Sequence, residues 1–408
     1  MKRRSSRRAN AGFTLVELMV ALVISGFVIG AMYSVGAASS RHFQVQHQVA
    51  NMQSALRFAM MQIKRDVMRA GYLATPLANR DFKECGMFAQ SANISFGGNG
   101  WMAGVSSYRN NVAPNVVDPT GNNAINGFTH DEITLIGNYA TSNEYPGIVG
   151  GGPGQSVITL TVNPITTWHS ILTDFGWDGD GVATSIVNQA LVQRAFPRNG
   201  LIRLETTGGL RHYATLSTAA VVAGNTISMT FAPPVPNACD MTGGRVAPLQ
   251  VIRYGAALTA AGDTGVASDR ATGQIARLMR TQRMPIDMSF ELQGSVSRVV
   301  LEYLAAFNLA FTMTPATGNG NPDFYAIGNS PDRTEDALRV NADPDRIRSI
   351  TVALSVRAPS TDPGMRFFNC ANLQCFQISP EAGVGGPAAR VRTLRAEIFL
   401  PNVAYEGY

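Results

Sequence analysis

A single carboxylate, Glu17, lies inside a long apolar segment near the start of the chain. Residues 13–38 read FTLVELMVALVISGFVIGAMYSVGAA, with one charge and no proline. This length suffices for a membrane span, which needs roughly 20 apolar residues, and exceeds the about 7–15 residues of a secretory signal core. An isolated charge in hydrocarbon is costly, so Glu17 is expected to be paired or protonated there.

Five cations precede this segment, and no acid accompanies them: Lys2, Arg3, Arg4, Arg7 and Arg8. Clustered cations predict that the N-terminus stays cytoplasmic and that the chain after residue 38 lies across the membrane. Without these five, 28 basic residues face 28 acidic ones, so no nucleic-acid partner is expected. The alternative is a cleaved signal, with its cut near Gly36-Ala37-Ala38.

A cluster of acids in the stretch DFGWDGDG could bind Ca²⁺, since carboxylates on a glycine-rich loop are calcium ligands. These acids are Asp174, Asp178 and Asp180. Aligned as an EF-hand loop, the stretch places Gly176 at position one and Val187 at position twelve, where carboxylates are required. We therefore expect a solvated turn, with a calcium loop of another type as the alternative, and no other metal or cofactor.

Enzymatic motifs are lacking. The glycine-rich stretch at residues 150–154 has no nearby lysine to complete a phosphate-binding loop, because the chain contains only three lysines. The histidines form no HxxxH or HExxH pair, and no serine lies in a GxSxG motif. The sequence thus favours a non-enzymatic protein.

The four cysteines would lie in an oxidising compartment if the chain crosses the membrane, and they allow three pairings. Cys370 and Cys375 enclose only four residues, which favours a bridge between them and leaves Cys85 with Cys239. The cysteines show no CxxC spacing and have no histidine nearby in sequence, which argues against a zinc site.

A long helix must position the N-terminal motif. The helical pattern continues past the apolar segment to about residue 70, because one apolar stripe recurs at steps of three and four: Val45, Val49, Met52, Leu56, Met60, Ile63 and Val67. Gly71 is a plausible C-cap, and the first proline is Pro76.

Beyond the helix, short alternating apolar runs are bounded by turn residues, which is typical of strands. They begin at Asp131, Ser156, Gly200, Asn225, Val296, Ile347 and Arg390. Little helical pattern separates them, so we predict an α+β fold: a long N-terminal helix packed on a large, mostly antiparallel β domain. Residues 314–346 are expected to be surface loop.

The N-terminus resembles that of prepilins of type IV pilus and type II secretion systems. Gly12-Phe13-Thr14-Leu15-Val16-Glu17, after a basic leader and before an apolar run, carries this resemblance. It implies that prepilin peptidase cuts between Gly12 and Phe13 and methylates the new amine of Phe13. Glu17 would then pair with the N-terminal amine of a neighbouring subunit, which would compensate its charge and set the axial stagger.

Two later stretches resemble the minor-pilin group PilW. One is QIKRDVMRAGYLATP from Gln62, in which residues 65–66 and 69–72 carry the match, and the other is RIRSITVALSVRA from Arg346. The last strand ends in FLPN where that group often has L-R-N, so the resemblance is weaker there.

The resemblance implies a minor pilin with four parts: a cleaved leader (1–12), a membrane and filament-core helix (13–38), its amphipathic continuation (39–73) and a β-rich head (74–408). Its expected partners are prepilin peptidase, other minor and major pilins and a tip adhesin. It would reside in the inner membrane, then in the periplasm and the pilus. The alternatives are a type II secretion minor pseudopilin and a membrane-anchored periplasmic binding or hydrolytic domain.

Overall fold

The protein was analysed as a computed structural model. The described residues are 14–78, 81, 83–85, 102–109, 130–146, 148–149, 153–161, 174–175, 188–224, 226–237, 239–258, 275–283, 296–314, 323–327, 340–366, 375–376 and 387–404. The chain forms two compact units, Met1–Gln53 and Ser54–Tyr408.

Helix α1 (Leu15–Met68) begins at an N-cap threonine and ends in a tight turn. The amides of Arg69 and Ala70 donate to the carbonyl three residues earlier instead of four, which tightens the last turn. Gly71 follows with a φ of 76°, a conformation that glycine adopts without steric cost.

The second unit contains two antiparallel sheets, and the first has twelve strands. Its strands are β1 (Val105–Arg109), β2 (Asp131–Gly137), β3 (Tyr145–Pro146), β4 (Ile148–Val149), β5 (Val157–Thr161), β6 (Leu201–Glu205), β7 (Arg211–Leu216), β8 (Val221–Ala223), β9 (Thr226–Ala232), β10 (Arg245–Leu258), β11 (Ala276–Arg283) and β12 (Val296–Glu302). Strand β10 joins two groups: its first half pairs with β6, and its second half pairs with β2 and β11.

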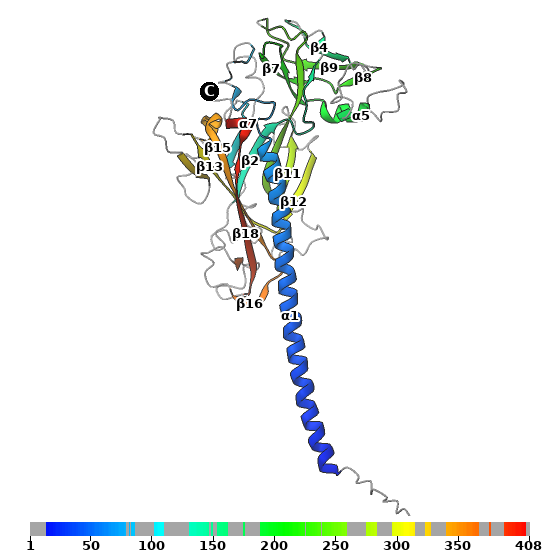
Figure 1. The fold of residues 1–408 in the computed structure, drawn as a ribbon, viewed down its shortest axis with the longest axis vertical. Helices are drawn as coiled ribbons and strands as arrows, with labels where there is room; N and C mark the ends of the chain where they lie inside the picture. The colour runs from blue at the N-terminus through cyan, green and yellow to red at the C-terminus, as the bar shows by residue number, and fades with distance from the viewer. Residues whose placement is uncertain are drawn as a thin grey trace, which may run out of the picture. The chain divides into compact units, whose positions relative to one another are not determined.

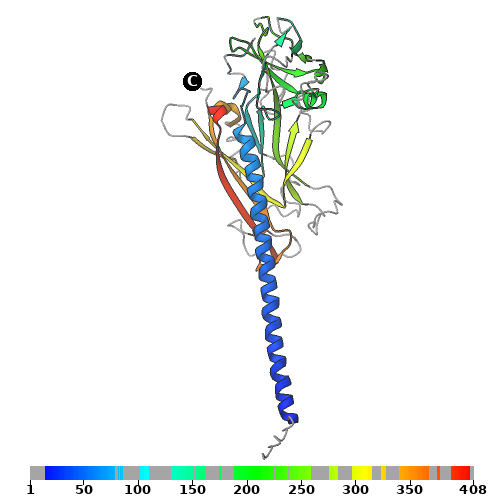
Figure 2. The same ribbon diagram turned by 45° about the vertical axis from the view of Figure 1, so that its right-hand side comes forward.

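The second sheet has six strands, in the order β14-β13-β15-β18-β16 with β17 beside β18. Its strands are β13 (Leu304–Met313), β14 (Asp323–Ile327), β15 (Ile347–Arg357), β16 (Asp362–Arg366), β17 (Cys375–Phe376) and β18 (Pro387–Phe399). Figures 1 and 2 show β13, β15 and β18 on one side of the last turns of α1 and β11 and β12 on the other. Alternate side chains of β15, such as Ile350, Val352 and Leu354, are fully buried, as the two-residue period of a strand requires.

The described residues of this unit also form short helices, among them α5 (Gln189–Ala195), the 3₁₀ helix η5 (Pro344–Arg346) and α7 (Pro401–Ala404). Asn188 caps α5, because its side chain accepts a hydrogen bond from the amide of Ala190 at 2.9 Å. One core cluster includes Tyr145, Phe196 and Phe231 and contains buried residues of α5 and of β5, β6, β7 and β9.

The expected α+β class is confirmed, and all seven predicted strand segments overlap observed strands. The expectation of surface loop throughout residues 314–346 is wrong in part, because β14 and η5 lie within it. Strand β10 was not predicted from the sequence. That strand contains Pro248, which usually argues against an inner strand. β3 pairs with Val246 and β2 pairs from Gln250 onward, so Pro248 falls between two partners on that side.

Candidate assembly site

The first turn of α1 is closed by a reciprocal pair of side chains. The amide and the hydroxyl of Thr14 both donate to Oε2 of Glu17 at 2.9 Å, and the amide of Glu17 donates to Oγ1 of Thr14 at 3.3 Å. This arrangement is a capping box, which satisfies amides that the helix itself leaves unpaired. It holds the Glu17 carboxylate at the N-terminal end of the helix. The predicted cut between Gly12 and Phe13 lies outside the described residues.

The helix that follows is long and apolar enough to cross a membrane. An 18-residue window has a mean hydropathy of 2.3, and none of it is buried by the chain. Leu15, Phe27 and Tyr33 are each more than 75% exposed. Apolar surface of this extent requires lipid or other protein to cover it.

At the other end of α1, Asp66 is buried and tied to the first sheet. Its Oδ2 accepts hydrogen bonds from the hydroxyl of Tyr254 and from Nε of Arg280, both at 2.6 Å. The backbone carbonyl of Asp66 accepts a third hydrogen bond, from the hydroxyl of Tyr139 at 2.9 Å. These contacts join the end of the helix to β10, to β11 and to the segment after β2.

Electrostatics at this contact keep the two tyrosines neutral. Burial, followed by the negative charge of Asp66, raises the pKa of both Tyr139 and Tyr254 above its usual value. Burial lowers the pKa of Arg280, but the hydrogen bond and the charge of Asp66 together outweigh it, so the pKa is raised. The geometry is therefore that of a charged pair with neutral donors, which suits a fixed structural joint.

Arg69, Gly71 and Tyr72 extend this joint, which gives a structural role to three residues of the PilW-like stretch. The guanidinium of Arg69 donates to Oγ of Ser142 at 2.5 Å, and the hydroxyl of Tyr72 donates to the carbonyl of Ser142 at 2.9 Å. A Cβ on Gly71 would lie 3.0 Å from Val403, so a side chain there would crowd α7 as well as strain the backbone.

The C-terminal helix α7 closes the end of α1. Nδ2 of Asn402 donates to the carbonyl of Met68 at 2.9 Å, which satisfies one of the carbonyls left free at a helix C-terminus. Asn402 lies in the FLPN stretch whose departure from the PilW pattern weakened the resemblance. Its contact with Met68 shows that this stretch serves the helix end.

Sequence reasoning missed the partners Arg280, Tyr254 and Asn402. A signal for Asp66 itself was present, since it lies three residues after Ile63 and four before Ala70 and so shares the buried face of the helix. A carboxylate on such a face requires a buried partner, but nothing in the local sequence identifies it.

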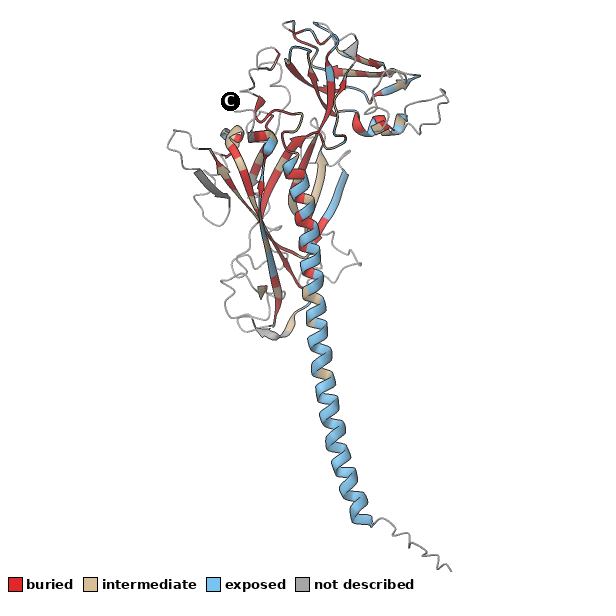
Figure 3. Cartoon of the chain, in the orientation of Figure 1, coloured by how far each residue is buried: buried red, intermediate tan, exposed pale blue. Residues whose placement is uncertain are grey.

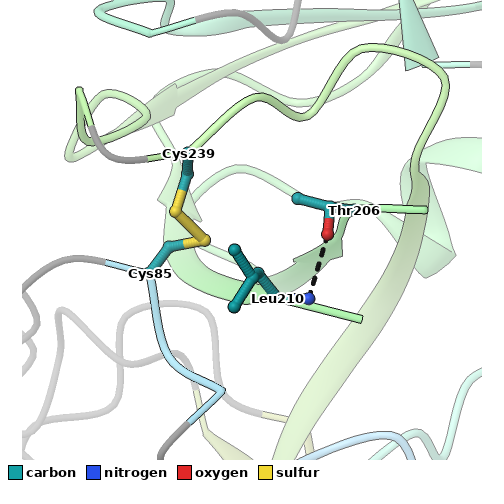
Figure 4. The surroundings of a disulfide bond; sticks show 4 residues. All are labelled: Cys85, Thr206, Leu210 and Cys239. Atoms are coloured by element: carbon teal, nitrogen blue, oxygen red, sulfur yellow. Dashed lines mark hydrogen bonds between the residues drawn. A yellow bond between two sulfur atoms is a disulfide. The ribbon is translucent and has the colours of Figure 1, made fainter. Parts of the chain in front are cut away.

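Cys85 and Cys239 form a disulfide that spans 154 residues of sequence. Figure 4 shows the bond beside the turn that joins β6 to β7. The amide of Cys85 donates to the carbonyl of Arg211 on β7 at 2.6 Å. Cys375 is also disulfide-bonded, and its expected partner Cys370 lies outside the described residues.

A chain of ion pairs runs along β6 and β7 next to this disulfide. Arg211 contacts Asp81 at 3.4 Å and Glu205 at 3.5 Å, and Arg203 contacts Glu205 at 3.0 Å and Glu144 at 3.1 Å. Alternating charges of this kind compensate one another within the head, so we infer a structural role for these residues.

Asp174, the first acid of the candidate calcium loop, has partners within the protein. Its Oδ2 accepts hydrogen bonds at 2.7 Å from Nδ2 of Asn143 and from the hydroxyl of Tyr145. Asp178 and Asp180 lie outside the described residues. Within the described ranges, no group of three or more His, Cys, Asp or Glu side chains is placed to hold a metal ion.

Comparison with known proteins identifies the N-terminus. The family described as "Prokaryotic N-terminal methylation motif" matches residues 7–33, and this motif marks pilin-like and pseudopilin-like structural proteins, which prepilin peptidase processes and which assemble with other pilins. No curated protein matches the chain. Phage phi92 endosialidase is similar to it with 9% identity and a TM-score of 0.15, over 66% of this chain and 41% of that one. This similarity is too low to indicate a shared fold.

Proposed function

We propose that this chain is a minor pilin of a type IV pilus, of the PilW-like group. The observation that carries the proposal is the methylation motif at residues 7–33, placed at the start of an apolar helix that the described residues leave exposed. Prepilin peptidase would remove residues 1–12 and methylate Phe13. The Glu17 carboxylate would then be available to the N-terminal amine of a neighbouring subunit.

The mature helix would anchor the subunit in the inner membrane through residues 13–38, and residues 39–73 would carry it into the head. The hydrogen bonds of Asp66 and Arg69 give residues 65–72, the stretch that resembles PilW, a structural role at the end of α1. The role we propose is structural and non-enzymatic.

We place the subunit in the complex that initiates the filament and remains at its tip. A head of more than 300 residues is hard to repeat along a shaft, and its size favours a terminal position. The head, residues 74–408, would face outward and contact other minor pilins or a tip adhesin, after passing from the inner membrane through the periplasm to the cell surface.

N-terminal mass spectrometry of the mature protein tests the processing step. We expect N-methylated Phe13, whereas a mature terminus near Ser39 would indicate a cleaved secretory signal and refute the proposal. Gold labelling of an epitope in the head tests the location, and even decoration of the whole filament would contradict a tip position.

A type II secretion pseudopilin is the second candidate, because the methylation motif is shared by both systems. Deletion of the gene separates them: loss of surface pili supports the pilus, and loss of secreted exoproteins supports the secretion system. Retention of both would favour a membrane-anchored periplasmic domain of another kind.

A further inference from the structure

The part of α1 in the second unit, residues 54–68, carries apolar side chains on two opposite faces. One face is buried in the head. The other bears Phe58, Met61 and Met68, which are 66%, 70% and 44% exposed and which we call the outer stripe. Their spacing of three and seven residues places them along one line of a helix.

The outer stripe lies away from the head. Met61 is two positions from both Ala59 and Ile63, which are fully buried, and two positions correspond to about 200° around a helix. Figure 3 shows the same contrast, with red and pale blue residues alternating along the last turns of α1. The head therefore gains nothing from the apolar character of these three side chains.

Cations accompany the outer stripe. Arg57 and Lys64 are exposed and lie seven residues apart along one side of it, and the side chain of Arg65, 70% exposed, falls between Met61 and Met68. Asp66 is the only acid among residues 54–68; it is buried and bound to Arg280, and its Oδ1 lies 3.8 Å from Nε of Arg65. Arg57 and Lys64 are therefore the cations of the segment that no acid within it contacts. The exposed surface of this segment is thus apolar and positively charged.

We propose that the outer stripe binds an amphipathic helix of a different pilin-type subunit, one that presents apolar residues flanked by Asp or Glu. This rests on the proposed function and narrows its partner class. A second copy of this chain packed stripe to stripe would bring Arg57, Lys64 and Arg65 against the same cations, and like charges across an interface oppose association. In any other packing of its α1, the only acids that helix contains are Glu17 and the buried Asp66, so it presents no pair of exposed acids to face these three cations. The segment therefore favours a heteromeric neighbour and disfavours a homopolymer.

Site-specific photocrosslinking in the native host tests this. The photoreactive residue p-benzoyl-phenylalanine replaces Met61 in the full chain, and the matched control replaces Phe399 on β18, which is equally exposed at 70%. We expect a crosslink from position 61, but not from position 399, to another pilin-type subunit. The double substitution Arg57→Glu and Lys64→Glu should lower its yield at least fivefold, and exchanging the facing acids of that subunit for lysine should restore it.

The N-terminal peptide of the crosslinked chain separates the two proposals. If Phe13 is N-methylated but position 61 crosslinks to a second copy of this chain, to lipid alone or to nothing, the heteromeric helix contact is refuted. The proposed pilin function is unaffected by these outcomes. An unprocessed N-terminus overturns both. Formation of the Cys85–Cys239 disulfide in each variant shows that the head has folded, so a lost crosslink cannot be attributed to misfolding.

Discussion

Replacing Asp66 by alanine should destabilise the head strongly. Asp66 is 2% exposed, and its carboxylate holds Arg280 and Tyr254 at 2.6 Å each. Removing the carboxylate leaves the guanidinium of Arg280, whose side chain is 16% exposed, without its partner. Breaking a buried pair in this way costs about 3–5 kcal/mol, which is a large share of the about 5–15 kcal/mol that holds a typical domain together.

The assay is urea unfolding of the full mature chain in detergent micelles, monitored by intrinsic fluorescence. Glu302→Ala is the matched control, since Glu302 pairs with Arg277 at 3.2 Å but is 45% exposed, and exposed pairs contribute about 0–1 kcal/mol. We expect a much lower urea midpoint for Asp66→Ala and almost no change for Glu302→Ala.

A double substitution separates the lost charge from the lost volume. Asp66→Leu combined with Arg280→Met replaces both ions by apolar groups, which is often neutral where breaking one partner is not. The double variant should recover more than half of the stability lost in Asp66→Ala. If the free energy of unfolding of Asp66→Ala lies within about 1 kcal/mol of that of the unmodified chain, the ion pair does not hold the end of α1 and the prediction is wrong.

Three further changes have defined outcomes. Tyr254→Phe removes one donor to the charged carboxylate of Asp66 and should cost about 1.5–3 kcal/mol in the same urea assay, and no change would show that the bond does not contribute. Burial lowers the pKa of His212, so the unfolded chain binds a proton first. The free energy of unfolding should therefore fall as pH drops below about 6.5, by at most about 1.4 kcal/mol per pH unit. Urea midpoints measured across pH 5–7 should show this dependence on pH in the unmodified chain and should lack it in His212→Gln. Replacing both Cys85 and Cys239 by serine opens a link across 154 residues and should cost about 2–4 kcal/mol, seen as a lower melting temperature under non-reducing conditions. Reducing agent should then lower the melting temperature by less than it does in the unmodified chain, because only the bond of Cys375 is left to reduce.

The helix and seven of the observed strands could be predicted from the sequence because their signals are local. The apolar stripe at Leu56, Met60, Ile63 and Val67 predicts a buried helix face, and all four side chains are buried. A period of 3.6 residues needs no knowledge of the partner surface. The N-terminal methylation motif is local as well, because it lies within one continuous segment, residues 7–33.

The joint at the end of α1 could not be predicted, because its partners are distant. Arg280 is 214 residues from Asp66, and Tyr254 is 188 residues away. Tyr254 lies on β10, which also pairs with β2, and Arg280 lies on β11, which also pairs with β12. Many arginines in the chain could neutralise one buried acid, and only the register of β10 against β11 selects Arg280.

Helix α1 contains only two carboxylates, Glu17 and Asp66, and their surroundings differ in a way that supports an assembly role. Asp66 has a guanidinium and a tyrosine from its own head as partners, so its charge is compensated within one subunit. Glu17 has only the amide and hydroxyl of Thr14, and no cation among the described residues pairs with it. A carboxylate that is capped but not paired with a cation, on a helix whose apolar surface is exposed, needs a cation to compensate its charge before it can reside in an apolar environment. Within the proposed function, that cation is the methylated amine of a neighbouring subunit.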